Sequence, residues 1–151
     1  MSLQVAHYFQ LLPNGDLPAI SSFSPFKAVV ILADEYSQAW QTTVSEWLVE
    51  QGCRYMMAWG PICSSWDDSV DHADIARGGL EDNSKFVLTT WHDDETLERV
   101  FWFSQFCAEF SYDGIELLNT LLIDVSNVDR GSELLRLFEQ SRDFADREGS
   151  D

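Results

Sequence analysis

The chain has 151 residues, of which 26 are Asp or Glu and 9 are Lys or Arg, so its formal net charge is −17 and its pI is near 4.2. This is the length of one ordinary domain, and a hydrophobic content of 45% indicates a packed core. The charge argues against direct binding to nucleic acids or anionic membranes, whose phosphates the acidic surface would repel. Three roles stay open for the acidic residues: they bind a basic partner, bind a cation, or keep the protein soluble.

Cysteine usage and the absence of targeting signals favour the cytoplasm. Cys53, Cys63 and Cys107 form no C-x-x-C pair, and an odd number of thiols in a domain of this size indicates a reducing compartment. Residues 1–16 show no signal peptide, and no apolar run has the length of a membrane span. We therefore expect a cytoplasmic protein.

The predicted elements begin after an irregular start. Residues 1–25 carry turn formers around the apolar stretch Tyr8–Leu12, which predicts a lead-in with at most one edge strand. A single α/β domain is predicted over residues 26–146, followed by a frayed acidic tail at 147–151. No internal repeat is present.

Within the domain, apolar strand patterns alternate with helical ones. Strands are predicted at 27–33, 53–59, 85–91 and 121–125 from their continuous apolar runs. Helices are predicted at 37–51, 64–76 and 94–110 and again from Gly131, with Gly52 at a C-cap position and residues 77–84 as a loop.

This alternation predicts an α/β fold. We expect a small three-layer sandwich of about four mainly parallel strands with helices on both faces, flavodoxin-like or Rossmann-like in type. Such sheets bind ligands in the crevice beyond the carboxyl ends of their strands. The side chains expected to converge there are Asp34, Glu35, Trp59, Trp66, Asp67, Asp71, Asp74, Trp91, His92 and Asp93.

A thiol and an imidazole are candidates for catalysis at this edge. Cys63 is predicted at a helix N-terminus, where the helix dipole favours a thiolate, and His92 ends the neighbouring strand. Nearby aspartates would raise the pKa of the thiol, and no third catalytic group accompanies the pair. The alternative is that Cys63 packs in a turn and His92 makes local hydrogen bonds.

Three aspartates are candidates for a metal site. Asp67, Asp71 and Asp74 are spaced i, i+4 and i+7, which places them on one stripe of a helix, where they could hold a divalent cation such as Mg²⁺ or Ca²⁺. A solvated acidic face explains the same spacing. No cofactor is predicted, and a divalent cation stays an open alternative.

The negative charge is unevenly distributed along the chain. The first 33 residues contain one acid and one base and sum to zero. Residues 62–83 contribute six acids and one base, and residues 92–98 contribute four acids, so these two segments supply −9. Both flank the same predicted edge of the sheet, which favours a basic partner there.

Two motifs are similar to those of a known family: W-G-P-x-C-x-x-W-x-D from Trp59 to Asp68, and T-T-W-H-x-D-E from Thr89 to Glu95. Over roughly Pro25 to Asp124 the chain resembles an uncharacterised bacterial family classed only as a domain of unknown function. The resemblance implies a bacterial cytosolic α/β domain and transfers no functional residue.

Two functions follow as hypotheses. The first is a non-enzymatic acidic module that docks a basic protein, as toxin-neutralising immunity proteins or regulatory proteins do. The second is a metal-dependent or cysteine-based enzyme, or a small-molecule binder, at the carboxyl ends of the strands. The residues that this second hypothesis uses are Asp34, Cys63, Asp67, Asp71 and His92. The sequence determines neither the oligomeric state nor the strand order.

Overall fold

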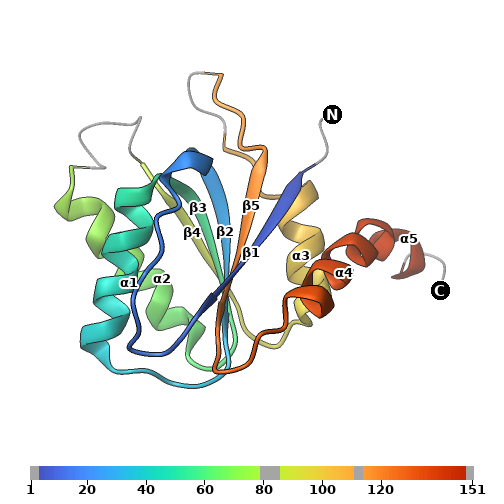
Figure 1. Cartoon of the computed structure of the whole chain (residues 1–151). Coiled ribbons are helices and arrows are strands. Elements are labelled where there is room, and N and C mark those ends of the chain that lie inside the picture. The colour runs from blue at the N-terminus through green and yellow to red at the C-terminus, as the bar shows by residue number, and fades with distance from the viewer. Residues whose placement is uncertain (1–3, 79–85, 111–113, 149–151) are drawn as a thin grey trace.

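The computed structural model describes residues 4–78, 86–110 and 114–148. Its centre is one sheet of five parallel strands in the order β1-β5-β2-β3-β4 (Figure 1). The predicted α/β class and parallel sheet are confirmed, but the sheet has five strands where about four were predicted. The strands are β1 (Val5–Leu11), β2 (Phe26–Leu32), β3 (Cys53–Trp59), β4 (Leu88–His92) and β5 (Asn119–Val125).

Helices cover both faces of the sheet and complete three layers. On one face lie α1 (Gln38–Gln51) and α2 (Cys63–Ala76), and on the other lie α3 (Leu97–Phe106) and α4 (Gly131–Gln140) (Figure 1). The chain ends in the 3-10 turn Ser141–Asp143 and the short helix α5 (Phe144–Glu148). Within the described part of the chain, no helix is long and apolar enough to cross a lipid bilayer.

The central strand β2 shows why the sheet is buried on both sides. All seven of its residues are buried, because successive side chains point to opposite faces and both faces carry helices. Ala28 and Val30 pack with the core under α1 and α2, whereas Val29 and Ile31 pack with the core under α3 and α4.

The additional strand comes from the predicted lead-in. β1 pairs in parallel with β5, which makes it one edge of the sheet. Its residues are mostly half-buried and include His7 and Gln10, so it lacks the continuous apolar run that marks the inner strands. The segment that follows contains the 3-10 turn Ser21–Phe23 and buries Ile20 completely as it leads to β2.

The third helix is shorter than the predicted 94–110. Thr96 caps α3, its Oγ1 accepting a hydrogen bond from the Arg99 backbone N–H at 3.2 Å. Asp94 has φ +59° and lies in the turn before Thr96, so it is not a residue of the helix. After Phe106 the chain buries Ala108 and Phe110 in a non-helical segment, whose apolar residues had suggested a longer helix.

The other boundaries lie close to those predicted. α1 ends at the left-handed Gly52, with φ +108°, as its C-cap position predicted. Only Arg77 and Gly78 of the predicted loop 77–84 are described, and Lys85 lies outside the described residues. Of the predicted tail, Arg147 and Glu148 are helical, and 149–151 lie outside the described residues.

Candidate functional site

The strand order places the topological switch point between β2 and β5, where doubly wound sheets usually open a crevice. One of these two strands, β5, carries a buried carboxylate near its carboxyl end. Asp124, near the end of β5, is fully buried and accepts hydrogen bonds from Arg130 Nε at 3.2 Å and Nη2 at 2.5 Å. The Tyr8 hydroxyl donates to the same carboxylate at 2.6 Å, and burial together with this bond raises the pKa of Tyr8 to about 12.

This cluster was absent from the site predicted by sequence. The sequence does contain a pattern that indicates this cluster: a carboxylate, Asp124, near the end of a buried strand, and an arginine, Arg130, six residues later. The sequence does not show that β1 pairs with β5, and Tyr8 reaches Asp124 only because these two strands lie side by side. A buried carboxylate with this many partners has a structural role, since removing the arginine would leave its charge unpaired.

The segment after β2 carries two of the predicted site residues. Asp34 and Glu35 are both exposed, and Asp34 Oδ1 accepts a hydrogen bond from the Glu35 backbone at 2.8 Å. Tyr36 turns inward, and its hydroxyl donates to the Val125 carbonyl at 3.0 Å. A cavity of about 290 Å³ lies between this segment and the start of α2, lined by Glu35, Tyr36, Gln38, Gln41, Pro61, Ile62, Ser65 and Trp66.

Cys63 and His92 lie on different sides of the sheet. Cys63 begins α2 and is buried in the core under α1 and α2, where burial raises the pKa of its thiol. The His92 ring packs against Phe103 of α3, with Nδ1 2.7 Å from Glu95 Oε2 and Nε2 2.8 Å from Thr90 Oγ1. The two side chains therefore do not form the nucleophile–base pair that the sequence suggested.

The three tryptophans predicted near the crevice have different environments. Trp66 is only 2% exposed and packs edge-on against Trp40, with ring centroids 6.4 Å apart. The half-buried Trp59 donates its Nε1 hydrogen to the Glu95 carbonyl at 2.7 Å. Trp91, on β4, is 49% exposed. Of the three, Trp91 alone presents a large aromatic surface to solvent.

The acidic stripe of α2 divides into a cluster and a separate aspartate. Carboxylate oxygens of Asp67, Asp68 and Asp71 lie within 4.8 Å of one another. Asp74 is instead held at the start of β4, where its Oδ2 accepts a hydrogen bond from the Val87 backbone at 3.1 Å. The predicted metal-binding set of Asp67, Asp71 and Asp74 is therefore not the set that α2 brings together. Asp68 takes the place of Asp74.

The cluster contains a buried carboxylate oxygen without a partner among the described residues. Asp67 is 7% exposed, and its buried Oδ1 accepts no hydrogen bond from any residue that the structure describes. Asp71 accepts a hydrogen bond from Thr89 Oγ1 at 2.7 Å, while burial and then the charges of the neighbouring aspartates raise the pKa of its carboxyl. Three carboxylates this close repel one another, and oxygen ligands of this kind suit hard cations.

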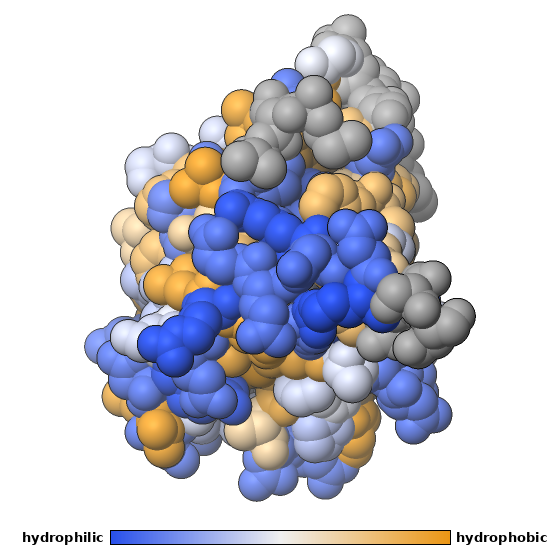
Figure 2. Space-filling model, turned by 90° about the vertical axis from the view of Figure 1, so that its right-hand side faces the viewer, coloured by the Kyte–Doolittle hydropathy of each residue, from blue (hydrophilic) through white to orange (hydrophobic). Residues whose placement is uncertain are grey.

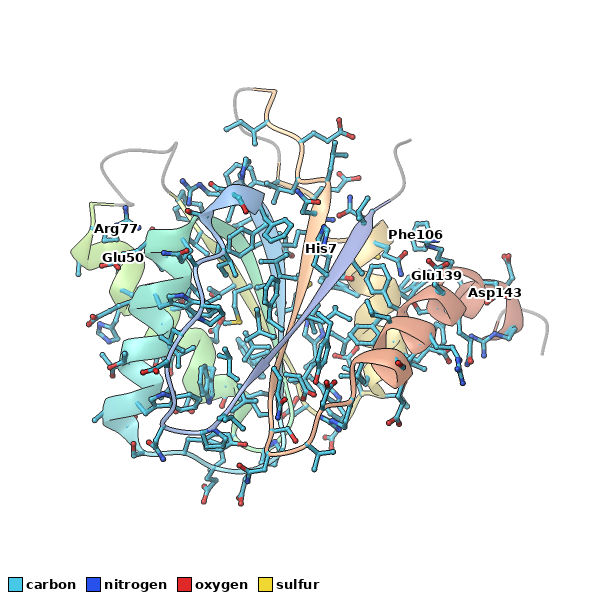
Figure 3. All side chains as sticks on the ribbon, in the orientation of Figure 1. His7, Glu50, Arg77, Phe106, Glu139 and Asp143 are labelled. Carbon is cyan, nitrogen blue, oxygen red and sulfur yellow. The ribbon has the colours of Figure 1, made fainter. Side chains whose placement is uncertain are left out.

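The opposite side of the molecule combines an acid excess with ion pairs, since residues 95–110 and 114–148 contain 11 Asp or Glu and 5 Arg. Figure 3 places Glu139 and Asp143 there, far from Glu50 and Arg77. Figure 2 shows strongly hydrophilic side chains gathered on this side. Some of its acids pair with arginines, including Glu139 with Arg142 at 2.7 Å and Glu98 with Arg147 at 2.5 Å. Five of the nine basic residues belong to α3 and the C-terminal part of the chain: Arg99, Arg130, Arg136, Arg142 and Arg147.

Comparison with protein families matches residues 6–141 to the Domain of unknown function (DUF7684), and the chain belongs to this family. This confirms the resemblance based on the tryptophan-containing motifs. The match begins inside β1 and extends beyond α4, so it spans every strand of the sheet. Comparison with curated proteins and with solved structures finds no match.

Proposed function

We propose that this DUF7684 domain is a binding module that docks a basic protein on its acidic side, defined here as α2, β4 and the turn after β4. The observation that supports this most directly is Trp91, which is 49% exposed on a strand at the edge of the sheet. Exposed tryptophans in such positions serve as anchors in protein interfaces.

Two segments next to β4, α2 and the turn after β4, carry carboxylates. Thr89 and Trp91 point to the same face of β4, because side chains alternate along a strand, and Thr89 contacts Asp71 of α2. Asp67 lies one helical turn before Asp71 and is therefore nearer the carboxyl edge of the sheet. Trp91 is likewise nearer this edge than Thr89 is. Exposed Asp93 and Asp94 follow β4 directly. An arginine or lysine here would meet carboxylates and an aromatic face together.

The edge position of β4 adds a second means of recognition. Among the described strands β4 pairs with β3 alone, so one row of its backbone N–H and C=O groups has no strand partner. An extended basic segment could add to this edge as a further strand. Such a partner suits a regulatory or an immunity-protein-like role.

The test uses a fluorescein-labelled nona-arginine peptide as the probe, with binding followed by anisotropy. We expect affinity to fall as salt is raised, and the variant Asp68→Asn/Asp93→Asn/Asp94→Asn to weaken binding about tenfold. Trp91→Ala is expected to weaken it as well, at unchanged net charge. The control variant Asp16→Asn/Glu109→Gln/Glu116→Gln removes three exposed charges elsewhere and should have a smaller effect. Equal losses in the two triple variants would show that net charge alone drives binding.

A second candidate function is supported by the buried Asp67 Oδ1, which has no hydrogen-bond partner among the described residues: the cluster Asp67–Asp68–Asp71 holds a divalent cation. Mg²⁺, Ca²⁺ and Mn²⁺ are the probes, with binding measured by calorimetry and by the rise in Tm on adding each ion. Asp67→Asn is expected to abolish this rise and, without ion, to leave Tm unchanged or higher, because it removes a buried unpaired charge.

Asp74→Asn is the matched control for the cation site, because Asp74 is a buried aspartate of α2 that also has an unpartnered Oδ1 but lies outside the cluster. It should keep the response to the ion. If no ion binds to the wild type, or if both variants respond alike, the cluster is an acidic surface feature of the docking site.

We also propose that this module works in the reducing cytoplasm of a bacterial cell. The chemical support is that Cys53, Cys63 and Cys107 are all free thiols, of which Cys107 is exposed. An exposed free thiol on a binding protein is best tolerated where disulfides are kept reduced.

A further inference from the structure

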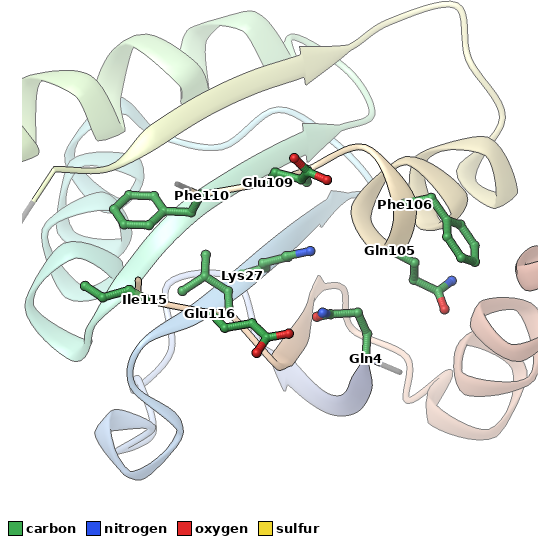
Figure 4. A pocket seen from close by; sticks show the side chains of 10 residues that line it. Gln4, Lys27, Gln105, Phe106, Glu109, Phe110, Ile115 and Glu116 are labelled. Carbon is green, nitrogen blue, oxygen red and sulfur yellow. The ribbon is translucent and has the colours of Figure 1, made fainter. Parts of the chain in front are cut away.

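A second pocket lies at the opposite edge of the sheet, where the parallel strands begin, and it contains a buried lysine. The cavity has a volume of about 230 Å³. Lys27, the second residue of β2, is 4% exposed and extends into the space between Gln4, Gln105 and Glu109 (Figure 4). None of the acidic features described above is part of this pocket.

The Lys27 amine is buried without a counter-ion. Its Nζ donates one hydrogen bond, to the Ser104 carbonyl of α3 at 2.6 Å. Among the residues that the structure describes, no carboxylate forms a salt bridge with it, although the chain contains 26 acids. Buried lysines are normally paired, so an amine left with one neutral acceptor is unusual.

The polar side chains around the amine have partners of their own. Gln105 Nε2 donates to Ser141 Oγ at 2.8 Å, and its Oε1 accepts from Arg142 Nε at 3.0 Å. Gln4 Oε1 accepts from Thr120 Oγ1 at 3.0 Å. These bonds fix the wall of the pocket and leave the amine facing the cavity, so the site is organised in advance for a ligand.

The lining determines what kind of ligand suits the pocket. The apolar side chains of Phe106, Phe110 and Ile115 form much of it, and the exposed Glu109 and Glu116 lie at its rim. The rim carboxylates would repel an anion, and the apolar wall favours a short hydrocarbon group. A small neutral molecule that reacts with an amine satisfies both conditions.

We propose that this pocket binds small neutral aldehydes or ketones and that Lys27 captures them as an imine. The neutral amine attacks the carbonyl carbon to form a carbinolamine. Loss of the carbonyl oxygen as water then gives the C=N bond, with protons exchanged with solvent at the open rim. The step needs no oxidant or reductant. Amines desolvated in apolar pockets are the ones that proteins use for this chemistry.

The titration of Lys27 is consistent with this role. Burial lowers the pKa of its amine to about 8, while the Glu109 carboxylate acts in the opposite direction. The other charged groups around the pocket are Glu116 at the rim and Arg142 behind Gln105. A neutral amine is therefore available near pH 8, well below the range in which an ordinary lysine becomes a nucleophile.

The chain allows a clean test, because it contains only two lysines, Lys27 and Lys85. Pentanal is the probe, sodium cyanoborohydride traps the imine, and peptide mass mapping separates the two lysines from the N-terminal amine. Near pH 7.5 we expect Lys27 to be alkylated at least about tenfold faster than Lys85, at a rate that saturates with pentanal concentration. Glyoxylate, an anionic aldehyde, should label Lys27 more slowly than pentanal does.

Variants separate pocket binding from simple reactivity. Phe106→Ser, at a side chain 37% exposed, should raise the half-saturating pentanal concentration several-fold and leave the Lys85 rate unchanged. Glu109→Gln should move the pH midpoint of Lys27 labelling below that of the wild type. The proposal is overturned if Lys27 reacts no faster than Lys85 in the folded protein, or if its labelling shows no saturation.

Discussion

At the residue scale, burial and distant neighbours determine the chemistry of the titratable side chains. Cys63 stands at a helix N-terminus, where the dipole favours a thiolate, yet burial raises the pKa of its thiol. His92 ends a strand beside acidic residues, but its ring is held between Thr90 and Glu95. The same residue types would be reactive in a more exposed and less crowded setting.

Lys27 gives a prediction about stability and pH. Its pKa is lowered from 10.5 to about 8 in the folded protein, so the unfolded chain binds more protons between these two values. The free energy of unfolding of the wild type, measured relative to Lys27→Met, is therefore expected to rise as pH increases from about 7 to about 10. A shift of this size corresponds to roughly 3 kcal/mol in total.

Urea denaturation of both proteins across this pH range provides the measurement. Cys53 and Tyr8, whose pKa values are raised to about 12, lower stability at high pH in both proteins and therefore cancel in the difference. If the difference in the free energy of unfolding between the wild type and Lys27→Met does not change with pH, burial does not lower the pKa of the Lys27 amine.

At the element scale, close contacts between strand ends position the acidic side. Gly60, between β3 and α2, has φ +117°, and a Cβ added there would lie 2.2 Å from the Leu32 carbonyl oxygen at the end of β2. Only glycine allows this approach of two backbones. The turn directs α2 back along the sheet, which brings Asp71 to Thr89 of β4.

Gly60→Ala is therefore expected to lower the free energy of unfolding by more than about 2 kcal/mol, since it combines a left-handed conformation with a backbone clash. Gly114→Ala is the matched control, because Gly114 has φ +72° but no atom of the other described residues, its chain neighbours aside, lies within 4 Å of the added Cβ. That variant should lose only about 1 kcal/mol. If chemical denaturation shows that the two variants lose the same free energy of unfolding, the contact between the added Cβ and Leu32 does not destabilise the protein.

At the scale of the whole molecule, the acid excess is not confined to one edge of the sheet, since residues 34–94 carry a net charge of −9 and residues 95–151 carry −8. α2 begins at the carboxyl edge and runs back to the start of β4, so Asp74 lies near the amino end of that strand. Glu95 and Glu98 pair with Arg99 and Arg147 on the α3 side. The acidic residues that were predicted to gather at the carboxyl edge of the sheet are thus spread along α2 and β4.

Self-repulsion of a chain with net charge −17 predicts that salt stabilises it. We expect Tm to rise by several degrees as NaCl is increased from about 0.05 M to about 0.5 M. Asp68→Asn/Asp93→Asn/Asp94→Asn should have a higher Tm at low salt and a smaller rise. Glu139→Gln, which breaks an ion pair with Arg142, should not raise Tm. A Tm that falls with NaCl would indicate that ion pairs outweigh the repulsion.

Much of the fold could be predicted from sequence, because β2 and β5 are mostly apolar and α1 ends at a glycine. β1 was harder to recognise, since a half-buried edge strand tolerates polar residues such as His7 and Gln10. The site was less predictable still. Trp66 and Trp91 both follow or end a predicted strand, and nothing local distinguishes the buried indole from the exposed one.

The sequence by itself determined the α/β class, the parallel sheet and the net charge, because apolar periodicity and composition are properties of the local chain. The tertiary structure decided that Asp68 rather than Asp74 completes the carboxylate cluster and that Trp91 is exposed. It also decided that Lys27, at the start of an apolar run, is buried and forms no salt bridge with any carboxylate that the structure describes. The physical reason is that burial and pairing depend on segments far apart in sequence, which meet only when the sheet and its helices pack.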